Sequence, residues 1–290
     1  MFKSLAVSVG VLIVLIALTW TAGLLTLSKA QVAPASKPVP VTFHSVAELT
    51  RQPGAQVTLR GARLANPKDW PASFYSAVPD GSCTSTLVGP RALLTAAHCV
   101  PDKGAAVIRK GGRNYTGTCS PSDLYHQGDR ETWSTDWAMC LMESPVTVSQ
   151  YETINSDPTR IQINTELLLT GFGCTKASGG GSDGQYRIGE APVTGLPTGT
   201  SNDIVTEGDV SLCFGDSGGG AFLFLDPGKT KRVQVSVNSR AGTDENGKLS
   251  KMSKLSSLST PQAQSFLKAW ASKNGVDVCG VTPGANNCRF

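Results

Sequence analysis

The sequence predicts an all-β body followed by one C-terminal α-helix. From about Leu59 to Leu258 the chain consists of short apolar runs separated by Gly, Pro, Asn and Asp, which is typical of strands joined by turns. Only residues 260–275 have the spacing of an amphipathic helix. With 290 residues, of which 40% are apolar and 17% charged, the chain is neither a disordered tail nor a disulfide-stapled miniprotein.

Residues 1–30 are expected to be a signal peptide or a membrane anchor. Leu5 to Leu27 is free of charge and has a lysine on each side. The length of this run favours an anchor, whereas the small residues in Ser28–Ala30 and Ala33–Ala35 favour cleavage, which we expect. Either fate delivers the chain to an oxidising space, secreted or in the periplasm or cell envelope, or anchored in a membrane and facing outside the cytosol. The even number of cysteines, eight, supports this.

Residues 31–58 contain three prolines and a mixed segment, and we interpret them as a linker or pro-segment. A glycine-rich stretch, Gly179–Ser182, is expected to be a loop, because strand-like segments continue on both sides of it.

Strands are predicted where apolar runs end in turn residues. Leu167–Leu169 stops before Gly171, and Ala221–Leu225 stops before an Asp-Pro-Gly-Lys turn. After that turn, alternate positions from Val233 to Val237 are apolar, so the two runs are expected to pair as a hairpin.

The C-terminal helix has recognisable start and stop signals. Thr260 can cap it, Pro261 suits its first position and Gly275 can end it. Its apolar side chains fall on one face: Ala263, Phe266, Leu267 and Trp270.

Charge and ligand patterns exclude several classes of function. The formal charge is +4, and without the two leader lysines it falls to +2, so no nucleic-acid groove is indicated. The chain has no Cys-x-x-Cys pair and no His-Glu-x-x-His motif, and its three histidines are His44, His98 and His126. We therefore expect no metal and no cofactor, with the cysteines in disulfides and with His44 and His126 in linker or surface positions.

Three short motifs supply a base, an acid and a hydroxyl: Thr95–Cys99 with His98, Asp136–Met139 with Asp136, and Gly215–Gly219 with Ser217. A serine hydroxyl becomes a good nucleophile when an imidazole accepts its proton, and a carboxylate must hold that imidazole in one tautomer. The glycines around Ser217 allow a sharp turn in which the amides of Gly215 and Ser217 converge on a developing oxyanion.

The chain order of these residues discriminates between hydrolase classes. Gly215–Gly219 also fits the elbow of lipases and esterases, but there the histidine follows the serine, and every histidine here precedes Ser217. The subtilisin order would need Asp69 or Asp80 as the acid, and neither lies in an apolar segment. Asp136 precedes an apolar run, which leaves the order His98, Asp136, Ser217.

With these motifs the chain resembles the chymotrypsin/trypsin family of serine proteases over about residues 59–272, as an exported, bacterial-type member. Gly171–Gly173 and Ser253–Leu255 resemble the family's Gly-Trp-Gly turn and its last strand. The resemblance implies two six-stranded antiparallel β-barrels, about residues 59–160 and 161–272, with the catalytic groups in the cleft between them and residues 273–290 as a tail.

The resemblance also implies roles for these residues. Ser217 would be the nucleophile, His98 the general base and then acid, and Asp136 the residue that orients His98, while the Gly215 and Ser217 amides form the oxyanion hole. Asp216 would pair with a newly freed N-terminus. The usual activation signal, a basic residue before Ile-Val-Gly-Gly, is missing, and we expect cleavage near residues 51–58 instead.

The disulfide framework is only partly implied by the family. The resemblance implies Cys83 with Cys99. Cys213 lacks its usual partner, because no cysteine follows it until Cys279. We expect Cys174 to replace that partner, with Cys119–Cys140 and Cys279–Cys288 as the remaining bridges, although eight cysteines allow many other pairings.

Substrate preference is expected to depend on Ser211, six residues before the nucleophile, where a trypsin-like enzyme has Asp. Because Ser211 is neutral, we do not expect a preference for Lys or Arg at the cleavage site. Ser236 matches the segment that lines the family's pocket, and Asn238 follows where the family often has Gly. Lys251, if it reached the pocket, would favour acidic side chains.

The sequence therefore predicts an exported serine endopeptidase that forms an acyl-enzyme on Ser217 and is not trypsin-like in specificity. Its partners would be a polypeptide substrate and a protein inhibitor, and the protein would be a monomer. The alternative is a catalytically silent binding or regulatory domain with the same fold.

Overall fold

The computed structural model describes residues 40–45, 59, 61–78, 81–174, 184–243 and 249–289. The chain divides into two compact units, residues 1–37 and 38–290, and every described residue belongs to the second unit. The leader, most of the linker, the expected cleavage region and the loop Gly179–Ser182 lie outside the described residues. Within the described ranges, no helix is long and apolar enough to cross a membrane.

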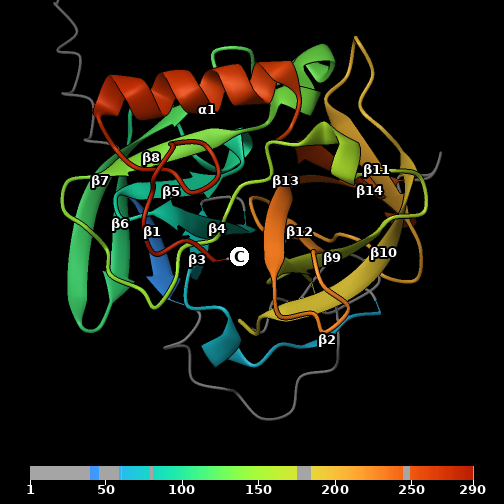
Figure 1. Cartoon of the computed structure of the whole chain (residues 1–290), viewed down its shortest axis with the longest axis horizontal. Coiled ribbons are helices and arrows are strands. Elements are labelled where there is room, and N and C mark those ends of the chain that lie inside the picture. Colours follow the sequence, from blue (N-terminus) through green and yellow to red (C-terminus); the bar gives the residue numbers. More distant parts are fainter. Residues whose placement is uncertain are drawn as a thin grey trace, which may run out of the picture. The chain divides into compact units, whose positions relative to one another are not determined.

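The first half of the unit is a closed β-barrel of seven strands (Figure 1). In barrel order the strands are β1 (Val41–Ser45), β3 (Ser73–Val78), β4 (Gly81–Gly89), β5 (Ala92–Thr95), β8 (Ala138–Met142), β7 (Arg113–Pro121) and β6 (Gly104–Lys110). Neighbours run antiparallel except β1 and β6, which are parallel. Fully buried side chains such as Phe74, Leu87, Leu94 and Ile108 fill its core.

Strand β1 makes the first barrel seven-stranded, where the resemblance implies six strands. It lies within residues 31–58, the predicted linker or pro-segment. In the barrel, β1 lies between β3 and β6 and buries Val41, Phe43 and Ser45. A five-residue alternation beside a proline-rich stretch is a weak signal, and the strand forms because β3 and β6 each offer it an unpaired edge.

The second barrel has the expected six strands: β9 (Glu166–Gly171), β10 (Arg187–Gly195), β11 (Asp203–Glu207), β14 (Leu249–Ser257), β13 (Arg232–Thr243) and β12 (Gly220–Phe224). The pairing of β10 with β11 closes this ring, and the short β2 (Arg63–Leu64) pairs with the start of β10 on the edge opposite β9. The predicted hairpin is confirmed, since β12 and β13 pair antiparallel across the turn that starts at Asp226.

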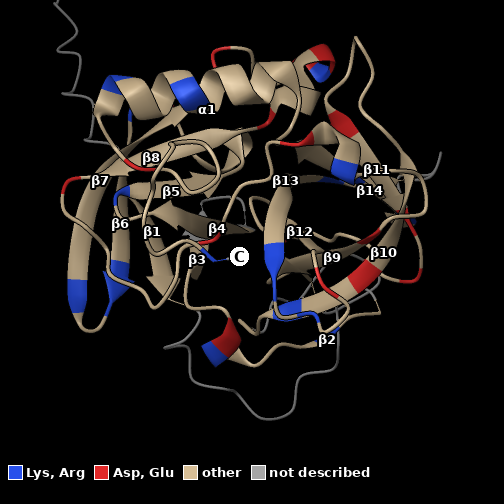
Figure 2. Ribbon diagram, viewed as in Figure 1, with Lys and Arg blue, Asp and Glu red and all other residues tan. Residues whose placement is uncertain are grey.

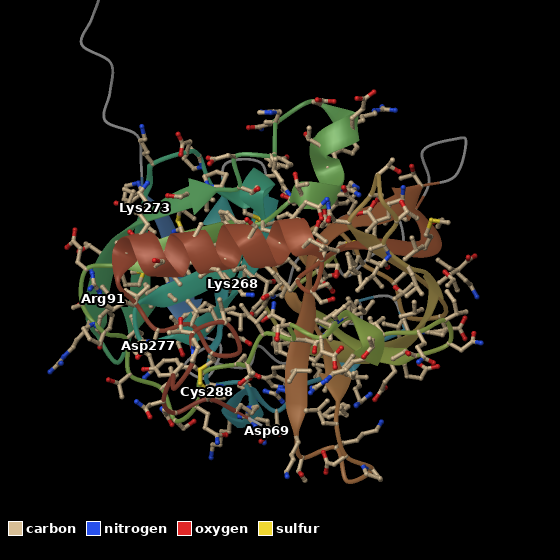
Figure 3. All side chains as sticks on the ribbon, turned by 45° about the horizontal axis from the view of Figure 1, so that its top comes forward. Asp69, Arg91, Lys268, Lys273, Asp277 and Cys288 are labelled. Carbon is tan, nitrogen blue, oxygen red and sulfur yellow. A yellow bond between two sulfur atoms is a disulfide. The ribbon has the colours of Figure 1, made fainter. Side chains whose placement is uncertain are left out.

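Helix α1 (Pro261–Asn274) confirms the predicted start and stop signals. The Thr260 hydroxyl accepts a hydrogen bond from the amide of Ala263 (3.4 Å), and Gly275 ends the helix with φ +59°. Although α1 follows the second barrel in sequence, its apolar face belongs to the core of the first. Figure 3 shows Lys268 and Lys273 on its exposed side.

Among the described residues, four 3-10 helices connect the strands: η2 (Pro67–Asp69), η3 (Ala97–Cys99), η4 (Arg130–Thr135) and η5 (Pro158–Arg160). In Figure 2, acidic and basic residues are spread over both barrels. Basic residues gather at the end of the β6–β7 hairpin, where Lys110 lies opposite Arg113 in the strand register.

All four expected disulfides form: Cys83–Cys99, Cys119–Cys140, Cys174–Cys213 and Cys279–Cys288. The last one closes the C-terminal tail, and Figure 3 shows Cys288 there. The tail is bound along the segment that joins the barrels, since the Tyr151 amide donates to the Asn287 carbonyl (2.9 Å) and the Arg289 amide donates to the Tyr151 carbonyl (2.8 Å). The tail therefore has a structural role.

Candidate active site

One cavity of about 570 Å³ collects the predicted chemical groups from both barrels. His98 and Asp136 come from the first barrel, and Ser217 and Ser239 from the second. The other lining residues are Tyr125, Gln127, Gly128, Arg130, Trp133, Cys213, Phe214, Arg240, Ala241, Thr243 and Leu249.

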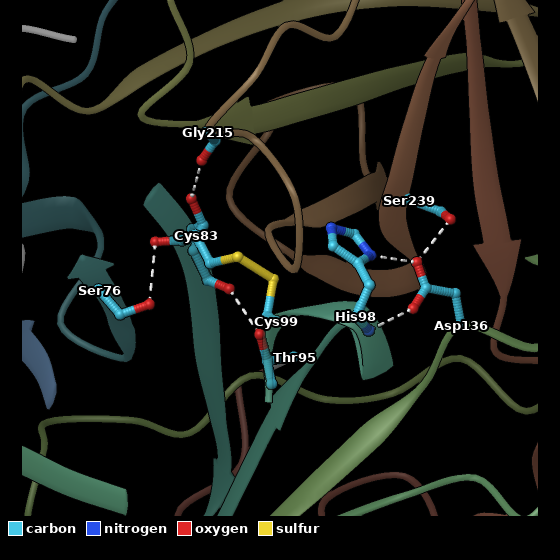
Figure 4. Close-up of a disulfide and its surroundings, with 9 residues drawn as sticks. Ser76, Cys83, Thr95, His98, Cys99, Asp136, Gly215 and Ser239 are labelled. Carbon is cyan, nitrogen blue, oxygen red and sulfur yellow. Dashed lines mark hydrogen bonds and ion pairs between the residues drawn. A yellow bond between two sulfur atoms is a disulfide. The ribbon is translucent and has the colours of Figure 1, made fainter. Parts of the chain in front are cut away.

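His98 and Asp136 form a hydrogen-bonded pair (Figure 4). Helix η3 carries His98, and Asp136 follows η4 at the entry to β8. Nδ1 of His98 lies 2.7 Å from Oδ2 of Asp136, and the His98 amide donates to Oδ1 (3.0 Å). The Asp136 side chain is 2% exposed and the His98 side chain 32%. The pair thus has a buried acid and an accessible base.

The two groups shift each other's pKa. Burial alone would raise the pKa of Asp136, but the charge of His98 and the hydrogen bonds from His98 and Ser239 lower it. Burial alone would lower the pKa of His98, but the Asp136 carboxylate raises it. The carboxylate is therefore ionised at neutral pH and favours a proton on the imidazole.

Ser239 is a site residue that the sequence analysis missed. Its hydroxyl donates to Oδ2 of Asp136 at 2.7 Å (Figure 4). In the pairing of β13 with β14, Asn238 and Arg240 oppose consecutive residues, so Ser239 is the extra residue of a β-bulge. A bulge turns a side chain out of the strand alternation, which aims Ser239 at Asp136. The only sequence signal was a serine three positions beyond Ser236.

The loop before β12 presents Ser217. The Ser217 carbonyl accepts from the Thr84 amide (2.6 Å), and the Gly218 amide donates to the Asn238 carbonyl (2.8 Å). The turn requires glycine, because φ is +106° at Gly215 and +80° at Gly218, and a Cβ on Gly218 would lie 2.2 Å from the Thr84 carbonyl oxygen.

The amides of Gly215 and Ser217 donate no hydrogen bond within the described part of the chain, so both are available to an oxyanion. Ser217 lines the same cavity as His98, although no hydrogen bond joins its hydroxyl to the imidazole. Such bonds are often long in the absence of substrate.

Asp216 belongs to this loop, and its side chain is fully buried. Its oxygens accept from the amides of Gly173 (2.6 Å) and Cys213 (2.8 Å). A Cβ on Gly171 or Gly173 would lie within 2.3 Å of these oxygens, which explains both glycines of the Gly-Phe-Gly turn. Burial raises the pKa of Asp216 to about 7, against the amide hydrogen bonds and the nearby charge of Arg187.

The expected pocket residues do not reach the cavity. Ser211, Ser236 and Asn238 are fully buried, and none lines it. Asn238 holds the nucleophile loop instead, since its amide donates to the Gly219 carbonyl (2.8 Å). On β13, Ser239, Arg240, Ala241 and Thr243 line the cavity instead, beyond Ser236 and Asn238, and the bulge at Ser239 changes which residues of the strand face it. Lys251 is exposed and paired with Asp209 (2.6 Å).

Potential metal ligands gather once among the described residues, at Cys83, His98 and Cys99. The two cysteines form a disulfide, so neither sulfur is a thiolate that could bind a metal.

Comparisons with known proteins place the chain among serine proteases. Residues 60–250 match the family model Trypsin. A trypsin from Saccharopolyspora erythraea is 28% identical over 180 residues, and brachyurin from Leptuca pugilator is 26% identical over 178; each alignment covers 55% of this chain and 79% of the relative. The solved structure of neuropsin, a serine protease expressed in the limbic system of mouse brain, matches with a TM-score of 0.55 at 16% identity, covering 74% of this chain and 98% of that one.

Proposed function

Because the chain belongs to the trypsin family, we propose that it is an exported serine endopeptidase that cleaves polypeptides through an acyl-enzyme formed on Ser217. The observation that carries the proposal is the buried Asp136, which binds His98 through both its amide and its Nδ1 beside Ser217 in one cavity.

The proposed reaction uses each group at a stated atom. Nε2 of His98 takes the proton from the Ser217 hydroxyl while Oγ attacks the substrate carbonyl carbon. The amides of Gly215 and Ser217 stabilise the resulting oxyanion, and loss of one such donor typically costs ~10²–10³ in rate. His98 then protonates the leaving amine, and water repeats the sequence on the acyl-enzyme. Asp136 keeps Nδ1 protonated, so that Nε2 remains the acceptor.

The direct test is covalent labelling by a fluorophosphonate probe. The wild-type protein, processed by its host, is expected to label with one probe per chain, and Ser217→Ala to lose all labelling. Ser256→Ala is the matched control, because that buried hydroxyl has no hydrogen-bond partner and should be dispensable. A folded wild type that never labels would instead support the catalytically silent domain.

One part of the cavity wall is apolar, and we propose that it favours neutral, apolar side chains at the cleavage site. Cys213, Leu249 and Ala241 line the cavity and pack with Cys174 in an apolar cluster, and the Phe214 side chain, next to Cys213, is 63% exposed. The described lining residues include one carboxylate, Asp136, which is already hydrogen-bonded to His98. We expect peptidyl phosphonates ending in Phe or Leu to label roughly tenfold or more faster than those ending in Lys or Arg, because a buried lysine would lack a partner. Faster labelling by the basic probes would contradict this specificity.

We also propose that a freed N-terminus from residues 51–58 pairs with Asp216. An amine there would add a positive charge beside Asp216, whose buried carboxylate has a pKa of about 7 despite the nearby charge of Arg187. Intact mass and N-terminal sequencing of the exported, active protein test this proposal together with cleavage of the leader. A mature start near residue 31 would contradict it.

A further inference from the structure

Arg240 follows Ser239 in β13 and lines the active-site cavity. Its Nη2 donates to both oxygens of Asp203 (2.8 and 2.7 Å). Its Nη1 donates to Oγ of Ser239 (3.0 Å) and to the carbonyl of Trp133. The side chain is 20% exposed. One guanidinium thus joins the start of β11, helix η4 and the bulge of β13 around Asp136.

The hydrogen bonds around Ser239 have a fixed direction. A guanidinium only donates, so Ser239 must accept from Arg240. The hydroxyl has a single proton, which is then left for Oδ2 of Asp136. Without Arg240, the hydroxyl could rotate toward another acceptor, and Asp136 would lose a donor.

Arg240 also adds charge beside the base. The titratable or charged groups that line the cavity with His98 are Asp136 on the segment before β8, Tyr125 before η4, Arg130 on η4 and Arg240 on β13. The disulfide Cys83–Cys99 beside η3 is neutral. Asp203 compensates part of the charge of Arg240, and the remaining charge lowers the pKa of His98, against the effect of Asp136.

We propose that Arg240 is a positioning residue of the catalytic pair: it orients the Ser239 hydroxyl toward Asp136 and, with its charge held by Asp203, disfavours protonation of His98. The catalytic part of this inference rests on the proposed function. Its consequence is that His98 is available as a base at a lower pH than the Asp136 carboxylate alone would allow.

The test is a proton NMR titration of the histidines in wild type, Arg240→Met and Arg240→Gln, together with fluorophosphonate labelling rates across pH. Both variants remove the charge. If Arg240→Met destabilises the fold, Arg240→Gln is the alternative, because its side-chain amide can still donate to the Trp133 carbonyl. The matched control is Arg109→Met, which removes the same charge from β6, where burial and Arg109 lower the pKa of His44.

We expect the Arg240 variants to raise the pKa of His98 and leave that of His44 unchanged, and Arg109→Met to do the reverse. At a pH below the His98 pKa, labelling of the Arg240 variants should slow roughly 3- to 10-fold, since less of the neutral base remains. A folded Arg240→Gln protein with unchanged His98 titration and labelling would overturn the inference. A wild type that does not label at all would overturn the proposed function, while the titration would still test the effect of Arg240 on His98.

Discussion

The bond between Ser239 and Asp136 depends on the strand register of β13. Ser236 and Ser239 lie on the same strand, but Ser239 alone reaches Asp136, because the bulge in β13 shifts the alternation by one residue. The hydroxyl of Ser236 is buried and has no hydrogen-bond partner.

We predict that Ser239→Ala slows fluorophosphonate labelling by roughly 10- to 100-fold, since a hydrogen bond to a charged group is worth about 1.5–3 kcal/mol. Ser236→Ala should label at the wild-type rate, because it removes an unsatisfied hydroxyl. Second-order labelling rates at neutral pH measure both. Equal slowing in the two variants would mean that general damage to β13, and not the bond to Asp136, sets the rate.

Among the strands, β1 has a weak signal in the sequence. It completes the first barrel by pairing with β3 on one side and β6 on the other, and it places Phe43 in the core. Cleavage near residues 51–58 would separate β1 from the rest of the barrel in sequence but not in space.

We predict that Phe43→Ala lowers the free energy of unfolding by about 3–5 kcal/mol, as for a fully buried aromatic side chain. His44→Ala, on the alternate face of the same strand, should change it by roughly 0.5 kcal/mol or less. Urea unfolding followed by tryptophan fluorescence measures both values.

The same strand should remain with the processed protein. If cleavage falls between residues 51 and 58, a fragment containing residues 41–45 is expected to co-elute in native gel filtration and to separate only in denaturant. A small effect of Phe43→Ala, together with loss of that fragment, would return residues 41–45 to a dispensable pro-segment.

In the whole molecule, two barrels are needed to assemble the site, because the His98–Asp136 pair and Ser217 come from different barrels.

The buried titratable groups of the site make the free energy of unfolding depend on pH. His98 has a raised pKa, so its stabilising contribution is complete below its ordinary value of 6.5 and is lost as pH rises through the higher value in the folded protein. Asp136 has a lowered pKa, so its contribution is present above its ordinary value of 3.8 and is lost as pH falls through the lower folded value.

We predict that activity and stability follow opposite trends from about pH 5 to pH 8. Labelling should increase as His98 loses its proton, while the free energy of unfolding falls. In the unprocessed protein, where no freed amine faces Asp216, this carboxylate adds to the fall up to its pKa of about 7, because the unfolded chain ionises it at lower pH than the folded one. Urea unfolding and labelling at half-unit pH steps provide the comparison, and Asp216→Asn should flatten the stability curve of the unprocessed protein below pH 7. Parallel rises in both quantities would contradict the assigned directions.

Local patterns made much of the fold predictable. The cap and stop residues of α1, the β12–β13 hairpin and the glycines at Gly215 and Gly218 are each set by neighbouring residues along the chain. Chain order alone excluded the lipase and subtilisin arrangements, since it does not depend on conformation. Two features could not be predicted from local patterns: a short strand that forms only between two existing strand edges, and a bulge that turns Ser239 toward Asp136.

The residue types and the spacing of the motifs were enough to predict which imidazole, carboxylate and hydroxyl could act together, and in which order they occur along the chain. That Ser239, 103 positions from Asp136, donates to that carboxylate, and that Arg240 donates to Ser239, could be seen in the folded protein alone. A hydrogen bond needs atoms within about 3 Å of each other. For residues so far apart in sequence, that distance depends on strand register and on the packing of the two barrels, which the residues nearby in the chain do not specify.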